Sequence, residues 1–166
     1  MSTGLVPAEF LGLVIRPVLA ALSEADPRLS TPAAERLMLG TAVYESRLRH
    51  MAQIGGPARS LFQIEPPTFN DVWQWITTSG GEKLRQASAR FCFGGIRASD
   101  QYAGNQHLAC VVARVLYWRR PEAMPAATDI DGLAAYYKRW FNTPLGAGQA
   151  SAWVQTFTAE CADAFS

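Results

Sequence analysis

The sequence is poor in the residues from which metal sites and disulfide frameworks are built. Among 166 residues it has three cysteines, Cys92, Cys110 and Cys161, and two histidines, His50 and His107. The cysteines form no C-x-x-C pair, and the histidines stand at no metal-ligand spacing with them. We therefore predict no metal site, no cofactor and no disulfide framework. The three thiols are expected to be reduced, as in a protein made in a reducing compartment.

Neither sign of charge is in excess, and no long apolar run is present. The chain has 15 basic and 14 acidic residues, for a net charge of +1, which gives no electrostatic basis for binding nucleic acid. No stretch approaches the roughly eighteen apolar residues that suggest a membrane span. The first apolar run has no basic residue before it and is interrupted by Arg16 and Pro17, unlike a signal peptide. We expect a chain made in the cytoplasm without a signal peptide.

Helical periodicity is the main pattern that the sequence does contain. Its composition, 49% hydrophobic and 17% charged, is typical of a globular protein, and we expect one domain over residues 1–166. Apolar residues recur at helical spacing, and no period-two alternation is sustained. Helices are predicted over 7–22 with a kink at Pro17, over 32–49, from Thr68 onward, and over 82–90, 105–119, 132–140 and 149–164. The predicted fold class is all-α or mainly α, with at most a very small sheet.

Glu45 is an acidic residue at an apolar position of the helix predicted over 32–49. On a projection at roughly 100° per residue, Met38 lies almost directly on Glu45, and most nearby positions are small or apolar. A carboxyl group withdrawn from water has a raised pKa and can donate a proton to a leaving-group oxygen, as the general acid of a glycosidase does. From spacing alone two alternatives stay open: an ion pair with an arginine from elsewhere, such as Arg59, or exposure at the helix end.

The segment from Glu45 to Thr68 resembles the soluble lytic transglycosylase and goose-type lysozyme family. That family has a helix-borne Glu-Ser followed by a Gly-x-x-Gly-Leu-Met-Gln-Ile-x-Pro-x-Thr loop. The residues shared with this pattern are Glu45, Ser46, Gly56, Leu61, Gln63, Ile64, Pro66 and Thr68, with Phe62 in place of methionine. The resemblance implies that Glu45 is the catalytic acid and base. It also implies that Ser46, Ser60, Phe62 and Gln63 belong to the substrate-binding cleft.

Two shorter stretches extend the resemblance to about residues 37–137. N-Q-H-L-A-C-V-V-A-R-V-L-Y-W is similar to the family's Asn-initiated central helix, and L-A-A-Y-Y to its Ala-Tyr-Asn motif. Asn105 and Tyr136 are thereby implied as further substrate-binding residues. The resemblance implies a single lysozyme-like domain with its cleft between the Glu45 helix and the Gln63 loop.

Three departures from the family pattern lie close to the implied cleft. Ser60 replaces the second loop glycine, Tyr137 replaces the usual asparagine, and residues 138–148 replace a short glycine turn. The Ser60 hydroxyl could donate a hydrogen bond to Glu45, or it could point away and leave the acid desolvated. We favour the first, because a hydroxyl there needs a partner. With these features the chain looks most similar to phage-encoded, virion- or tail-associated members of the family.

The function implied is cleavage of the MurNAc–GlcNAc β-1,4 bond of peptidoglycan, as a lytic transglycosylase with one catalytic glutamate. A hydrolase would use a second carboxylate, for which Glu65 and Asp71 are candidates. The alternatives are a catalytically weak or inactive lysozyme-like structural protein of a phage virion or secretion apparatus, and a glycan-binding module. The expected partners are peptidoglycan glycan strands, with phage tail or virion proteins as further candidates. The chain would then act outside the cytoplasm, on periplasmic or cell-wall peptidoglycan.

Overall fold

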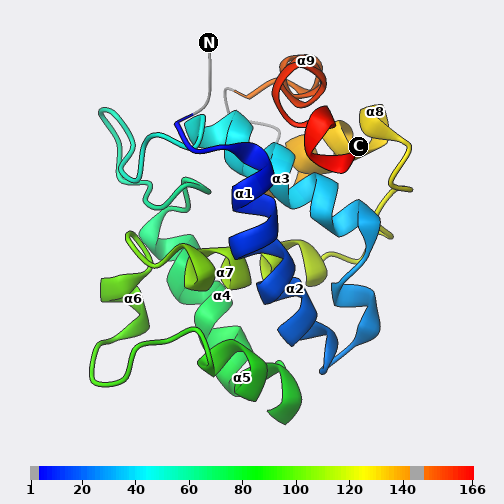
Figure 1. Cartoon of the computed structure of the whole chain (residues 1–166). Coiled ribbons are helices and arrows are strands. Elements are labelled where there is room, and N and C mark those ends of the chain that lie inside the picture. Colours follow the sequence, from blue (N-terminus) through cyan, green and yellow to red (C-terminus); the bar gives the residue numbers. More distant parts are fainter. Residues whose placement is uncertain (1–3, 143–147) are drawn as a thin grey trace.

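The computed structural model describes residues 4–142 and 148–166, and this part of the chain is mainly helical (Figure 1). This confirms the predicted fold class, because only the isolated bridges Ala52–Arg59 and Arg59–Ile64 have β geometry in the described ranges. The α-helices are α1 (Pro7–Phe10), α2 (Arg16–Ser23), α3 (Pro32–Ser46), α4 (Pro66–Thr78), α5 (Glu82–Ala89), α6 (Ala98–Gln101), α7 (Gln106–Trp118), α8 (Ile130–Tyr137) and α9 (Ala150–Glu160). Of the departing segment 138–148, residues 143–147 lie outside the described residues, as do residues 1–3 at the start of the chain.

A π-helical segment, Leu11–Ile15, joins α1 to α2 just before Pro17. Pro17 has no N–H to offer the carbonyl of Leu13, and its ring crowds that carbonyl. The Leu13 carbonyl instead accepts a hydrogen bond from Nε2 of His107 on α7, at 2.9 Å. The proline that was expected to kink the first helix therefore frees a carbonyl that ties this helix to the centre of the molecule.

Helix α3 lies at the centre of the fold and packs against α7, α8 and α9 (Figure 1). Most of its residues are buried, including Leu37, Met38 and Val43. Gly40 faces Trp153 of α9, and a Cβ at position 40 would overlap the indole ring. A glycine within a helix costs about 1 kcal/mol relative to alanine, and here it allows the two helices to approach closely.

Helix α3 ends three residues earlier than predicted. Arg47 (φ 53°) and Leu48 (φ 51°) adopt left-handed backbone conformations, so the helix cannot continue to residue 49. The Ser46 hydroxyl accepts a hydrogen bond from the Leu48 N–H at 3.1 Å, which stabilises this turn. As a result Glu45 stands in the last turn of α3, where the chain leaves the helix.

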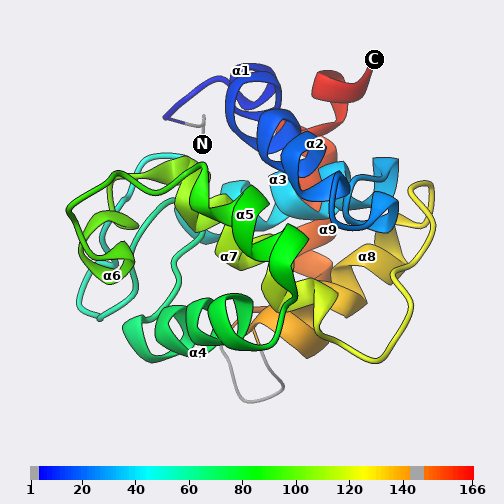
Figure 2. The ribbon, with the colours of Figure 1, turned by 90° about the horizontal axis from the view of Figure 1, so that it is seen from below.

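Two other boundaries also differ from the sequence-based predictions. Helix α4 begins at Pro66 rather than after Thr68, because two prolines occupy its first turn and hold Glu65 in an extended conformation before it. The stretch between the helices predicted over 82–90 and 105–119 contains the short helix α6, which was not predicted. In the view of Figure 2, α4 lies along one edge of the molecule, and α7 and α9 lie further towards its middle.

Within the described residues, no helix has the length and apolar character needed to cross a membrane.

The three cysteines are free thiols, and they differ in burial. Cys110 and Cys161 are fully buried, whereas Cys92 is partly exposed. Burial raises the pKa of Cys161 to about 12 and that of Cys110 well above its usual range. The pKa of Cys92 is raised as well, by its partial burial.

We predict that a thiol reagent labels Cys92 alone in the folded protein and all three cysteines after denaturation. The thiolate is the reactive form, and the two buried thiols neither ionise readily nor meet the reagent. Intact-mass measurement of protein purified without reductant checks this, with Cys92→Ser as the control that should remain unlabelled when folded. If the mass of the unlabelled protein were lower than that expected for three free thiols by the mass of a pair of hydrogen atoms, a disulfide would be present and the prediction would be contradicted.

Candidate active site

A cleft of about 900 Å³ opens beside the last turn of α3. Its walls come from α3, from residues 50–65, from the start of α4, from α7 and from the chain that follows α8. Its volume is within the range of typical small-molecule sites. The ionisable and amide side chains in its wall include Tyr44, Glu45, His50, Gln63, Glu65 and Tyr137.

Glu45 occupies this cleft as a partly buried carboxyl group. Its Oε1 accepts a hydrogen bond from the Tyr137 hydroxyl at 2.5 Å, and no salt bridge to it is found among the described residues. Arg59, the alternative partner considered from the sequence, donates instead to the carbonyls of Gly56 and Ala58 in its own loop. The structure therefore does not contain the ion pair that would have given Glu45 a structural role.

The pKa of Glu45 is raised to about 7, mainly because burial removes water from the charged form. The hydrogen bond from Tyr137 acts in the opposite direction, because it stabilises the carboxylate. At neutral pH the two protonation states of Glu45 are therefore similarly populated. Such a group can donate a proton in one step and accept one in the next.

Tyr137 is held rigidly behind this carboxyl group. It is fully buried, with Tyr44 edge-on at 5.4 Å between ring centroids and Phe141 and Trp153 stacked at 6.0 and 6.3 Å. Burial and the neighbouring Glu45 raise the pKa of Tyr137 far above its usual range. Its hydroxyl therefore stays protonated and acts as a donor to Glu45.

The opposite wall is a loop, residues 50–65, that is fastened both internally and to the helices behind it. Gln53 N–H donates to the Ala58 carbonyl at 2.9 Å, and Arg59 and Ile64 exchange a pair of backbone hydrogen bonds. The Tyr102 hydroxyl donates to the Ile64 carbonyl at 3.1 Å. These bonds keep a loop with little regular structure in one conformation, as a binding wall requires.

Gln63 is the predicted cleft residue that the structure brings into the same cleft as Glu45, in the opposite wall. Its backbone is left-handed (φ 50°), and its Nε2 donates to the carbonyls of His50 at 2.9 Å and Ser60 at 2.8 Å. The amide thus joins both ends of the loop. Its Oε1 accepts no hydrogen bond from the described residues and belongs to a side chain that lines the cleft.

Three other predicted cleft residues do not line the cleft. Ser46 donates to the Ala42 carbonyl at 3.0 Å, and the Phe62 ring packs in the core beside Phe10. The buried Ser60 hydroxyl accepts from the Phe62 N–H at 3.2 Å and has no hydrogen bond to Glu45 among those that the structure describes. The expected donation from Ser60 to Glu45 is therefore not found, and the hydroxyl lies against the backbone of its own loop instead.

Asn105 and Tyr136 also lie outside the cleft wall. Asn105 caps α7, accepting from the Leu108 N–H at 3.1 Å and donating to the Phe91 carbonyl at 2.7 Å. The Tyr136 hydroxyl donates to the Glu122 carbonyl at 3.1 Å on another side of α8. Consecutive helical residues point about 100° apart, so a shift of one position exchanges Tyr136 for Tyr137 as the tyrosine of the site.

The two candidate second carboxylates are in different surroundings. Glu65 is exposed and lines the cleft, whereas Asp71 pairs with Arg119 at 2.8 Å. The described residues contain no group of three His, Cys, Asp or Glu side chains that could hold a metal ion.

No protein-family model matches the chain, and no curated protein and no solved structure matches it either.

We predict that Tyr137→Phe raises the pKa of Glu45 further above neutrality. The substitution keeps the ring stack but removes the donor that favours the carboxylate, and a hydrogen bond to a charged group corresponds to roughly one or two pKa units. Titration of the Glu45 carboxyl carbon by NMR measures the shift. Ser60→Gly is the matched control, which should leave the pKa unchanged because its hydroxyl bonds to Phe62. A lower or unchanged pKa in the phenylalanine variant would contradict the contact.

We also predict that Glu45→Gln stabilises the protein above neutral pH relative to wild type. The folded-state pKa of about 7 exceeds the usual 4.5, so ionisation in the unfolded chain removes stability as the pH rises through this window. The amide cannot ionise, and its oxygen can still accept from Tyr137. The difference in unfolding free energy should grow by at most about 3 kcal/mol between pH 4 and pH 8. Urea denaturation of both proteins measures it, and a constant difference across this range would show that Glu45 is not desolvated.

Proposed function

We propose that this protein is a lysozyme-like peptidoglycan glycosidase that cleaves the MurNAc–GlcNAc β-1,4 bond, as a lytic transglycosylase with Glu45 as its catalytic acid and base. The observation that carries the proposal is a carboxyl group in an open cleft whose pKa is raised to about 7. The resemblance of residues 37–137 to the soluble lytic transglycosylase and goose-type lysozyme family is the reason for proposing peptidoglycan as the substrate. The all-α fold is compatible with such a domain.

In the first step, neutral Glu45 donates its proton to the glycosidic oxygen as the bond from that oxygen to the anomeric carbon breaks. The sugar develops oxocarbenium-ion character, and Glu45 is left as a carboxylate. The Tyr137 hydroxyl, 2.5 Å from Oε1, stabilises the negative charge that appears at this moment. The hydrogen bond from Tyr137 becomes stronger as Glu45 loses its proton, because a charged acceptor binds a donor more tightly than a neutral one. An interaction that strengthens during the reaction lowers its barrier.

In the second step, the same carboxylate accepts the proton of the attacking hydroxyl. In a lytic transglycosylase that hydroxyl belongs to the muramyl sugar itself, so an anhydro sugar is formed and no second acid is needed. In a hydrolase it belongs to water, which a second carboxylate can activate. Glu65 is exposed and lines the same cleft, so it is the carboxylate that a hydrolase could use for this purpose.

The remaining cleft wall suits a carbohydrate. Tyr44, Phe141 and Ile54 offer apolar surface for sugar faces, and Ile54 is 83% exposed. Gln53, Thr68 and Asn142 add groups that can bond to hydroxyl and acetamido substituents. This mixture of apolar surface and a few amide or hydroxyl groups is typical of sites for uncharged polar ligands.

An inactive structural protein of a virion or secretion apparatus is the second candidate, and its support came from Ser60 and Tyr137. The open cleft beside Glu45 weighs against it, because a purely structural protein has no reason to keep a desolvated acid facing open space. Under the proposed function the chain reaches periplasmic or cell-wall peptidoglycan after synthesis in the cytoplasm. A role as a phage tail or virion component would provide that route.

We predict that the purified protein releases muropeptides with anhydro-muramyl ends from isolated sacculi. Mass analysis of the products distinguishes the mechanisms, because reducing ends would indicate a hydrolase instead. Glu45→Gln should lower the rate by at least about a hundredfold, since general acid catalysis is typically worth two to four orders of magnitude.

The matched control for this experiment is Glu65→Gln, which removes the other carboxylate of the same cleft. It should retain most of the activity if Glu45 works alone, and a loss comparable to that of Glu45→Gln would indicate a hydrolase with two carboxylates. A Glu45→Gln protein with more than about a tenth of the wild-type rate would refute the assignment of the acid. No release by the wild type would favour the structural alternative.

A further inference from the structure

A second cavity, of about 590 Å³, lies at the C-terminal end of α7 and shares no lining residue with the cleft. Three arginines line it: Arg28 from the turn before α3, Arg114 from α7, and Arg120 just beyond α7. The acid among its lining residues is Glu122. Cationic side chains are therefore concentrated in a concave site that the proposed glycosidase chemistry does not use.

Arg114 is the most unusual of these residues, because it is only 2% exposed and forms no salt bridge among the described residues. Its Nε donates to the Leu29 carbonyl at 2.9 Å and its Nη2 to the Arg28 carbonyl at 3.1 Å, while its Nη1 is buried without a hydrogen-bond partner in the described part of the chain. Its role in anchoring the turn before α3 thus accounts for two of its three nitrogens, and its charge is offset only by the longer-range attraction of Asp26.

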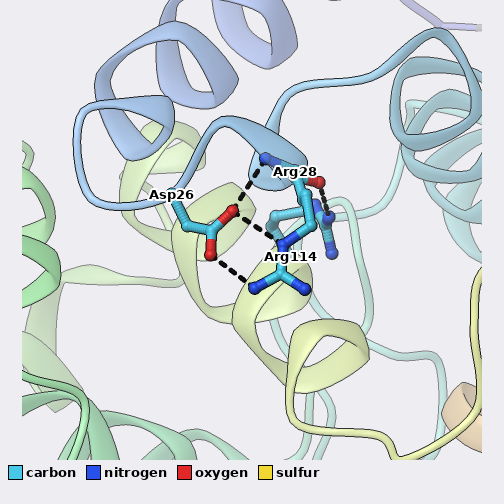
Figure 3. A network of polar contacts seen from close by, with 3 residues as sticks. All are labelled: Asp26, Arg28 and Arg114. Carbon is cyan, nitrogen blue, oxygen red and sulfur yellow. Dashed lines mark hydrogen bonds and ion pairs between the residues drawn. The ribbon is translucent and has the colours of Figure 1, made fainter.

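Burial lowers the pKa of Arg114 to about 10, so the side chain remains charged at neutral pH. Its nearest acid, Asp26, is already engaged. The Asp26 carboxylate accepts hydrogen bonds from the backbone N–H and the guanidinium of Arg28, the latter at 2.7 Å, whereas Arg114 donates to the Arg28 carbonyl (Figure 3). A buried charge without a partner is costly, and the cavity beside it is the place from which an anion could offset that cost.

Arg120 repeats this pattern on the neighbouring turn. Its Nε is buried without a partner, and its Nη2 donates to the Trp140 carbonyl at 3.3 Å. The Glu122 carboxylate is engaged by Arg139 at 3.1 Å and by the Trp140 indole at 2.9 Å. Both nearby acids are therefore paired with other groups, and two guanidinium nitrogens of the cavity lining have no acceptor.

We propose that this cavity binds a small organic molecule through a carboxylate or phosphate group. Guanidinium groups bind such oxyanions more strongly than other polar ligands, because charge and planar geometry both match. Arg28 and Arg120 are more accessible and would make the direct contacts, and Arg114 contributes its charge from behind. Trp118, Pro121 and Met124 supply the apolar wall for the rest of the molecule.

The Trp118 ring is well suited to form that wall. The guanidinium carbons of Arg28 and Arg114 lie 5.0 and 5.7 Å from its centroid, which fixes the ring among the cations. The cavity volume is within the range of sites for small organic ligands. An aromatic face beside guanidinium groups is a combination that accommodates an organic anion better than a bare inorganic ion.

The experiment is an NMR titration of nitrogen-15-labelled protein with sodium phosphate and, separately, with sodium acetate. Sodium chloride at matched ionic strength is the reference. The arginine Nε–H and Trp118 indole signals should shift and saturate in the millimolar range with either oxyanion and not with chloride. Tighter binding of phosphate would assign a phosphorylated ligand, and tighter binding of acetate a carboxylate ligand.

Arg120→Gln should weaken the binding about tenfold, because it removes a charge-assisted donor. The matched control is Arg97→Gln, which removes an exposed arginine paired with Asp100 as Arg28 is paired with Asp26, but far from the cavity. Circular dichroism establishes that each variant is folded, and Arg28→Gln replaces Arg120→Gln if the latter is not. Equal shifts with chloride, or equal affinities in the cavity and control variants, would overturn the proposal.

Discussion

The withdrawal of the last turn of α3 from water is the constraint on which the rest of the site depends. Helix α3 is covered by α7, α8 and α9, so the carboxyl group of Glu45 lies where few water molecules can solvate a charge. Its pKa rises to about 7 for that reason. Three other features act on the same carboxyl group: the hydrogen bond from Tyr137, the loop of residues 50–65 that forms the opposite wall, and the early end of α3.

The hydrogen bond from Tyr137 lowers the pKa of Glu45 and so opposes the rise that burial causes. Desolvation alone would raise the pKa of Glu45 further, and an acid with a higher pKa donates its proton less readily in the first step of the reaction. The tyrosine hydroxyl cannot ionise in its buried position, so it always donates. The balance between these two effects leaves Glu45 able to work in both directions near neutral pH.

Several polar residues of the family-like motifs serve the backbone rather than the cleft. Ser46 stabilises the end of α3, Ser60 bonds within its loop, and Asn105 caps α7. Buried backbone groups need partners, and short polar side chains next to turns are the closest available. The same requirement explains the bond between His107 and the Leu13 carbonyl, which has lost its usual donor at Pro17.

The sequence by itself determined the helical character of the chain, most helix positions and the place of Glu45 on an apolar face, because periodicity depends on neighbours along the chain. The place of Gln63 in the predicted cleft came from the family resemblance. The tertiary structure decided which residues meet that acid. Tyr137 lies 92 positions away from Glu45, and whether it or Tyr136 faces the cleft depends on how α8 is rotated against α3. The lack of a salt bridge to Arg114 among the described residues was equally invisible, because contacts between distant segments decide it and no spacing along one helix reveals them.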